Sequence, residues 1–176
     1  MIFKLVSKLT FIITLGTILR LIGIFIYGDT RVDNEWGIML NNLENNNILS
    51  VRSVDGTPVP NIFMPPLYPF FLYLIKIFYN DLYFYLLSVQ LIQLILSLIS
   101  IYFTYKILRE LFSNNYSLVG TFLFSIFPLN VYAVSQISSI TLQIFLLNLF
   151  LFSFIKLFKK INYKYISIFS LSSGLL

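Results

Sequence analysis

Two carboxylates stand two residues apart in a polar stretch that follows a long apolar run. Asp33 and Glu35 belong to the sequence DNEW, and the apolar run ends near Tyr27. A carboxylate here could accept a proton from a substrate hydroxyl, and the pair could hold a divalent cation through oxygen ligands. Alternatively, Asp33 caps a helix and both acids only keep the loop hydrated. No cofactor is certain, and any metal would use these two acids.

Four further polar residues could bind an anionic or hydroxyl-rich substrate. Arg20 lies inside the apolar run, where a charge costs about 2.5 kcal/mol or more and indicates a functional site or a buried partner, unless the side chain extends to the membrane surface. Arg52 and Lys76 could contact a lipid phosphate, or they could simply be solvated. Gln136 belongs to a short polar turn that we expect on the same side of the membrane as Asp33.

Other kinds of chemistry are excluded by composition. The chain has no cysteine and no histidine, so it has no disulfide, no thiolate and no histidine base or metal ligand. Acid–base chemistry must use Asp, Glu, Lys or Tyr. The net charge is +5, but the basic residues lie at the ends of apolar runs. This pattern indicates membrane orientation and not a nucleic-acid partner.

The elements that position these residues are predicted to be membrane helices. Of the 176 residues, 58% are hydrophobic and 11% are charged, and the mean hydropathy is +0.86. A soluble domain of this size could not bury so much apolar surface. The sequence therefore predicts an all-α polytopic membrane protein. Four segments reach the ~20 residues that a span requires, and a fifth begins near the end of the chain: 9–27, 82–105, 116–135, 138–155 and 165–176. Because the fifth stops mid-span, we expect the sequence to be the N-terminal part of a larger protein, inactive alone.

The segment 65–79 is apolar but short for a span, because 15 helical residues reach only roughly 22 Å. The positive-inside rule favours a model in which it does not cross. The N-terminus and most basic residues then share the cytoplasmic side, namely Lys4, Lys8, Lys106, Arg109, Lys156, Lys159, Lys160 and Lys164. We therefore predict that 65–79 is an interfacial or re-entrant helix on the outer side, held among membrane lipids.

The loop 28–64 is then extracytoplasmic, and it contains five of the seven acids. Within it, Trp36, Met39, Leu40 and Leu43 recur at helical spacing and form one apolar face. We predict an amphipathic helix over 34–45 that lies on the membrane, with Asp33 at its N-cap position. The sequence VDGTPVP, residues 54–60, predicts a turn-rich connector.

The order of these motifs resembles a known family. Arg20 ends an LR pair in the first span, DNEW follows it outside, PPLYPFFLYLI occupies 65–75, LRELF occupies 108–112 and FP occupies 127–128. The chain resembles the membrane glycosyltransferases of the GT-C superfamily. Within that superfamily it is most similar to the branch that contains dolichyl-phosphate-mannose–protein mannosyltransferases and bacterial lipid A sugar transferases.

The resemblance implies an inverting transfer of a sugar from a polyprenyl-phosphate donor to a lipid, glycan or protein acceptor, outside a bacterial inner membrane. It assigns the base to Asp33, with Glu35 beside it, and it places Pro65, Pro66 and Tyr68 near the donor lipid. Some relatives carry Lys before the Pro-Pro pair. This chain has Met64 there, so we expect Arg52, or a residue of the larger protein beyond this sequence, to contact the phosphate.

Two other functions stay open on sequence grounds. A transporter or flippase subunit would place its substrate site near the membrane midplane, on broken helices or buried charges. Here the central spans carry almost no charge and the acids gather in an outer loop, which argues against ion coupling. A non-catalytic membrane assembly protein with interfacial helices is the third possibility.

Overall fold

The described part of the chain is mostly helical and contains one short β-hairpin. The computed structural model describes the backbone of residues 2–60 and 65–176, and side chains from residue 8 onward. Its elements are α1 (Ile2–Tyr27), α2 (Glu35–Asn46), β1 (Arg52–Val54), β2 (Thr57–Val59), α3 (Leu67–Lys76), α4 (Leu82–Leu111), α5 (Asn114–Ile126), α6 (Pro128–Ser135), α7 (Ile140–Lys159) and α8 (Tyr163–Leu175).

Three helices in the described part of the chain are long and apolar enough to cross a membrane: Lys8–Tyr27 of α1, the whole of α4 and the whole of α7. A fourth span is possible if α5 and α6 are counted as one helix bent by 44°. The all-α polytopic class is thus confirmed. The bend falls at Pro128, which starts α6, because proline has no N–H to continue the preceding helix. The sequence predicts 116–135 as one span, and the structure divides this segment into two helices at Pro128.

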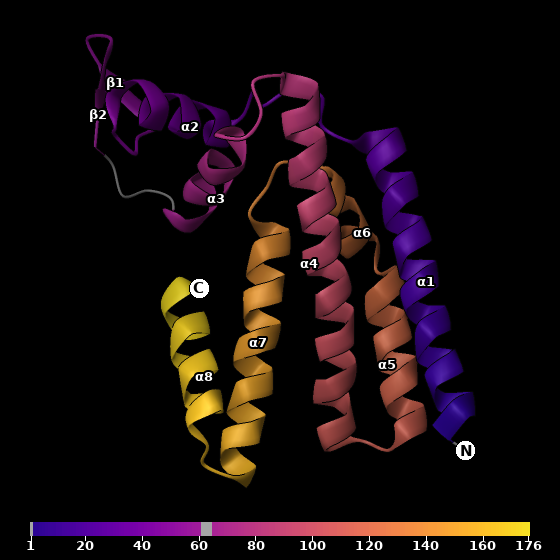
Figure 1. Ribbon diagram of the computed structural model, residues 1–176. Helices are drawn as coiled ribbons and strands as arrows, with labels where there is room; N and C mark the ends of the chain where they lie inside the picture. The colour runs from indigo at the N-terminus through magenta and orange to yellow at the C-terminus, as the bar shows by residue number, and fades with distance from the viewer. Residues whose placement is uncertain (1, 61–64) are drawn as a thin grey trace.

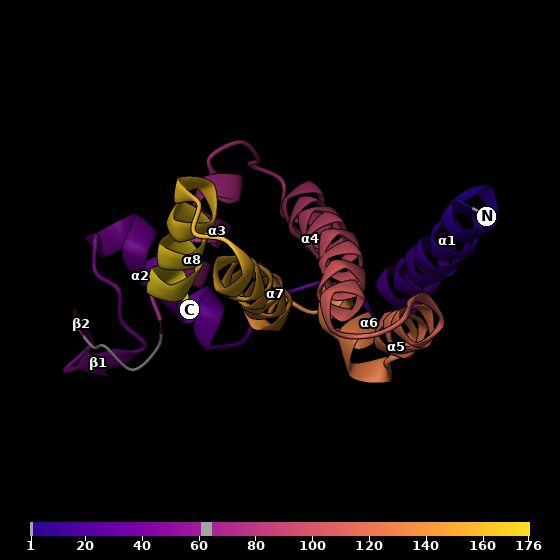
Figure 2. The same ribbon diagram turned by 90° about the horizontal axis from the view of Figure 1, so that it is seen from below.

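The long helices alternate in direction, and the short elements gather at one end of them (Figure 1). This end is where α1 finishes and α4 begins, and it holds α2, the hairpin and α3; we call it the loop end. Viewed along the helices, α1, the α5–α6 pair, α4, α7 and α8 form a curved row (Figure 2). The row is one helix thick over much of its length, so many apolar side chains face outward, as expected for a protein in lipid.

The bend between α5 and α6 is held by buried side chains. The carbonyl oxygen of Ser125 accepts a hydrogen bond from Nη1 of Arg20 at 2.8 Å, and that of Phe124 accepts one from Asn130 Nδ2 at 3.3 Å. Carbonyls freed by a helix break inside a membrane need such partners, and a cation at a helix C-terminus is also favoured by the helix dipole. Arg20 is therefore positioned to stabilise the broken span.

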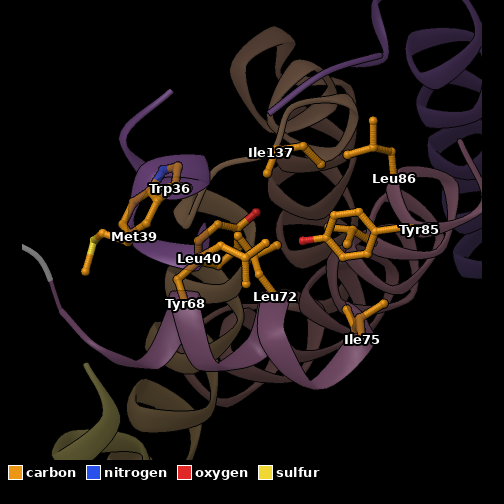
Figure 3. Close-up of a cluster of buried hydrophobic side chains, with 10 residues drawn as sticks. Trp36, Met39, Leu40, Tyr68, Leu72, Ile75, Tyr85, Leu86 and Ile137 are labelled. Carbon is orange, nitrogen blue, oxygen red and sulfur yellow. The ribbon is translucent and has the colours of Figure 1, made fainter. Parts of the chain in front are cut away.

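The core at the loop end joins α2, α3 and α4 (Figure 3). Trp36 of α2 contacts Tyr68 of α3 edge to face, with ring centroids 4.9 Å apart. Leu72 and Val89 are fully buried beside them. The full cluster is Trp36, Met39, Leu40, Tyr68, Leu72, Ile75, Tyr85, Leu86, Val89 and Ile137. Trp36, Met39 and Leu40 of the predicted apolar face are indeed buried. They pack against α3 and α4, where we had expected contact with lipid.

The connector after α2 is a small antiparallel hairpin. Arg52 pairs with Val59 across β1 and β2. The turn residues Asp55 and Gly56 have φ of 50° and 80°, and two positive φ values are typical of the type I′ turns that join tight hairpins. Sequence analysis recognised the turn residues but not the strands, which have only three residues each.

Candidate functional site

A partly polar pocket of about 550 Å³ opens at the loop end, between α2 with the segment before it, the end of α3 and the start of α4. It combines charged and amide groups with an apolar wall. The residues that line it are Arg31, Val32, Asp33, Gly37, Ile38, Leu40, Asn41, Asn42, Lys76, Leu82 and Tyr85.

Asp33 is available to this pocket because its neighbour performs the capping. The N-cap of α2 is Asn34, whose side chain accepts a hydrogen bond from the Gly37 N–H at 3.4 Å and donates one to the Ile137 oxygen at 3.1 Å. The prediction that Asp33 caps this helix is therefore wrong. Among the described residues no group hydrogen-bonds the Asp33 side chain. Its carboxylate is exposed at the pocket wall.

Gly37 holds the acid-bearing segment close to α2. A methyl group at this position would collide with the backbone oxygen of Val32 and lie 3.1 Å from its Cγ1. Only glycine lets the chain before Asp33 pack so tightly against the first turn of the helix. The local backbone, and not a side-chain contact, therefore fixes where Asp33 stands.

Glu35 is the first residue of α2, is exposed, and is not among the residues that line the pocket. The structure thus places Glu35 outside the pocket that Asp33 lines. Within residues 2–60 and 65–176 no three acidic residues lie close enough to hold a metal ion. A cation held by Asp33 and Glu35 stays a prediction.

Two cations line the pocket with Asp33. Lys76, at the end of α3, forms an ion pair with Glu44 of α2, with Nζ and Oε2 2.5 Å apart. This pair ties the two helices together. Arg31 is exposed, and no ion pair engages it in the described part of the chain. Sequence reasoning missed Arg31, although its place two residues before Asp33 was a usable signal.

The other residues predicted for substrate binding lie elsewhere. Arg20 is fully buried, and its Nε donates to Ser97 Oγ at 2.8 Å. Arg52 is exposed on β1. Pro65 and Pro66 are exposed at the start of α3, where Pro65 borders a small cavity beside α7 and α8. None of these residues lines the pocket.

Met64, where some relatives carry lysine, lies outside the described residues. The candidate phosphate contact at the start of the Pro-Pro element is therefore not placed.

Gln136 belongs to a network that fixes the loop end. Its Nε2 donates to the Tyr27 oxygen at 2.7 Å, at the end of α1. Nearby, Gln90 Nε2 donates to the oxygens of Asp29 and Ser135 at 3.1 and 3.0 Å. Asp29 Oδ2 accepts the Ile137 N–H at 2.6 Å. These bonds join the ends of α1 and α6 to α4, so they position the segment that leads to Asp33.

Gln93 connects this network to α3. Its Nε2 donates to the oxygens of Val134 and Gln136 at 3.2 and 2.8 Å, and its Oε1 accepts the Tyr68 hydroxyl at 3.3 Å. Burial raises the pKa of Tyr68, and the nearby Tyr85 and Asp29 raise it further. Tyr68 is therefore a neutral hydrogen-bond donor that orients α3, and it does not line the pocket.

An apolar groove of about 520 Å³ lies next to the pocket, between the ends of α1 and α4 that meet at the loop end. Leu82 lines both. The walls of the groove are mostly aliphatic. Asp29 and Asp81 lie along it, each with one carboxylate oxygen already accepting a backbone N–H. The remaining lining residues are Leu21, Ile24, Phe25, Gly28, Thr30, Tyr83, Leu86, Leu87, Gln90 and Leu91.

The fold and the site together define a polytopic membrane protein with a charged pocket beside an apolar groove at one end of its helices. The family model of the dolichyl-phosphate-mannose-protein mannosyltransferases matches residues 64–176. Because the match covers most of the chain, the chain belongs to this family and is a membrane glycosyltransferase. Comparison with curated proteins and with solved structures gives no match.

The matched region contains α3 to α8, with Tyr68 and Lys76. Asp33 and Arg31 precede it. The case for Asp33 therefore rests on its place in the pocket and on the motif order, and not on the family match.

Proposed function

We propose that this protein transfers a sugar from a polyprenyl-phosphate donor to a hydroxyl of a lipid, glycan or protein acceptor, with Asp33 as the base. In this reaction the acceptor oxygen attacks the anomeric carbon and gives its proton to the Asp33 carboxylate. The bond from that carbon to the phosphate oxygen breaks, polyprenyl phosphate leaves, and the anomeric configuration inverts. The observation that carries the proposal is the unengaged carboxylate of Asp33 in a pocket that two cations also line.

The two cations suit the leaving phosphate. Negative charge grows on the phosphate oxygen as the sugar departs, and positive groups fixed nearby lower the barrier. Lys76 is already paired with Glu44, so Arg31 is the more available partner. A guanidinium can bind two phosphate oxygens at once. Arg52, which lies away from the pocket on β1, is a weaker candidate.

The apolar groove supports a lipid-linked donor. A polyprenyl chain needs an apolar path that reaches the polar site without crossing water. The groove between α1 and α4 has such walls and meets the pocket at Leu82. We infer that the phosphate stands near Leu82, with the sugar on the Asp33 side and the chain on the α1 side.

The charge distribution supports an extracytoplasmic pocket with the N-terminus in the cytoplasm, and we place the protein in a bacterial inner membrane because the motif order resembles the bacterial members of the superfamily. Glu110, at the far end of α4, accepts hydrogen bonds from Lys156 and Lys159. Basic residues thus gather opposite the loop end, as the positive-inside rule requires of the cytoplasmic side.

A transporter is less well supported. A transporter site near the midplane could use the buried charge of Arg20. That side chain donates hydrogen bonds to Ser97 of α4 and Ser125 of α5 and to the Gly16 oxygen of its own helix, so it joins three packed helices.

Transfer by the full-length protein in proteoliposomes tests the proposal. The donors are polyprenyl-phosphate mannose and, as the alternative, a nucleotide-linked mannose. We expect product from the lipid-linked donor only, and we expect Asp33→Asn to lose it while Asp55→Asn, on the exposed hairpin turn, keeps it. Transfer from the nucleotide sugar alone would contradict the proposal.

A further inference from the structure

A second residue that lines the pocket, Tyr85, has a hydroxyl without a hydrogen-bond partner among the described residues. Tyr85 projects from the first turns of α4 into the contact with α2 and α3 (Figure 3) and is 2% exposed. Its hydroxyl is buried and has no hydrogen-bond partner within residues 2–60 and 65–176. Tyr85 also lines the pocket that holds Asp33.

Such a hydroxyl is costly to leave unpaired. Buried polar groups almost always have a partner, and each exception calls for an explanation. Phenylalanine would fill the same space without the unpaired group. The unpaired hydroxyl therefore weakens the unliganded fold. A ligand that supplies a hydrogen-bond partner would explain why tyrosine stands here.

The chemistry of the pocket indicates which partner. The wall of the pocket that Tyr85 lines combines the apolar side chains of Leu40 and Leu82 with the amide-bearing Asn41 and Asn42. The Nδ2 of Asn42 donates a hydrogen bond to the Ser50 oxygen, at 2.9 Å. A hydroxyl that both donates and accepts, set beside an apolar surface, suits a hydroxyl of a sugar ring better than a phosphate, which would draw on the cations.

We propose that the Tyr85 hydroxyl binds one hydroxyl of the transferred hexose and so helps to determine sugar specificity. This inference rests on the proposed function and deepens it. Tyr85 is a substrate-binding residue here, and it takes no part in the proton transfer.

The test combines an unfolding measurement with substrate analogues. Tyr85→Phe is compared with wild type, with polyprenyl-phosphate mannose and its set of monodeoxy analogues as donors. Wild type should lose about three- to tenfold in kcat/KM for one of these analogues, which is the effect of losing one neutral hydrogen bond. Tyr85→Phe should show the same loss with mannose itself and no further loss with that analogue.

Without donor, Tyr85→Phe should unfold at the same temperature as wild type or higher. Tyr105→Phe is the matched control, because its hydroxyl donates to Asn114 Oδ1 at 3.2 Å. It should unfold at a lower temperature and keep wild-type kcat/KM.

Two results would overturn the inference while leaving the proposed function intact. One is that Tyr85→Phe unfolds at a lower temperature, as the control does, which means the hydroxyl has a partner in the fold. The other is that Tyr85→Phe discriminates against every analogue just as wild type does. If wild type transfers no sugar, or if Asp33→Asn transfers it as well as wild type, the proposed function fails and this inference fails with it.

Discussion

Replacing Gln93 with leucine should destabilise the loop end. The side chain is fully buried. It makes hydrogen bonds to the backbone oxygens of Val134 and Gln136 and to the hydroxyl of Tyr68. Leucine has nearly the same volume but makes none of these bonds, so the effect isolates the polar contacts.

The size of the effect follows from those contacts. Hydrogen bonds between membrane helices contribute about 0.6 kcal/mol each on average, which gives about 1 kcal/mol for the two bonds to the backbone oxygens. The substitution also leaves the buried Tyr68 hydroxyl without its hydrogen-bond acceptor, at a cost of about 1–3 kcal/mol. We therefore expect the free energy of unfolding to fall by about 2–4 kcal/mol.

Gln143→Leu is the matched control. Gln143 is exposed, and its Nε2 donates only to Ser139 Oγ at the start of its own helix, at 3.1 Å. The loss there should be about 0.5 kcal/mol or less. Unfolding of the purified protein in detergent micelles, followed by loss of helical circular dichroism, measures both variants. Equal losses for Gln93→Leu and Gln143→Leu would refute the reasoning, since the network would then contribute nothing.

Two further predictions concern packing and topology. Gly16→Ala should destabilise the protein by about 1–3 kcal/mol, because the new methyl group would collide with Ser125 Oγ and lie 3.0 Å from Ile101 Cδ1. Gly23→Ala, whose methyl group would lie 3.6 Å from its nearest neighbour, should be tolerated, and equal thermal shifts would count against this account. For topology, the chain has no native cysteine, so Asn80→Cys should react with an impermeant maleimide added outside spheroplasts, whereas Asn115→Cys should react only after lysis. Labelling of Asn80→Cys from the cytoplasmic side alone would invert the topology.

The sequence predicts the class of fold well, because composition and helix length alone require membrane helices. It also finds the apolar face of α2, because the spacing of Trp36, Met39 and Leu40 is a local property. The sequence does not decide what covers that face, since α3 comes from a later part of the chain. It also misplaces the cap of α2, because Asp33 and Asn34 are both good capping residues and only the tertiary contact of Asn34 with Ile137 separates them.

The candidate site shows the same division. Its chemistry and its place after the first span are enough to make Asp33 a candidate. Its pocket partners Arg31 and Tyr85 are not, because the pocket forms only where three separate elements meet. Arg20 is the opposite case, because the sequence suggested a functional role and the structure shows packing contacts. An intramembrane charge suggested a substrate site, but its partners Ser97 and Ser125 are 77 and 105 residues away, so no local pattern could reveal a packing role.

The central claim is that the Asp33 carboxylate is the base for sugar transfer. The most direct test is the rate of transfer from polyprenyl-phosphate mannose by full-length Asp33→Asn, at saturating donor, beside Asp55→Asn. Loss of a general base typically lowers the rate by about 10²–10⁴-fold, and we expect a loss in this range for Asp33→Asn with unchanged thermal stability. Wild-type turnover by Asp33→Asn would contradict the account.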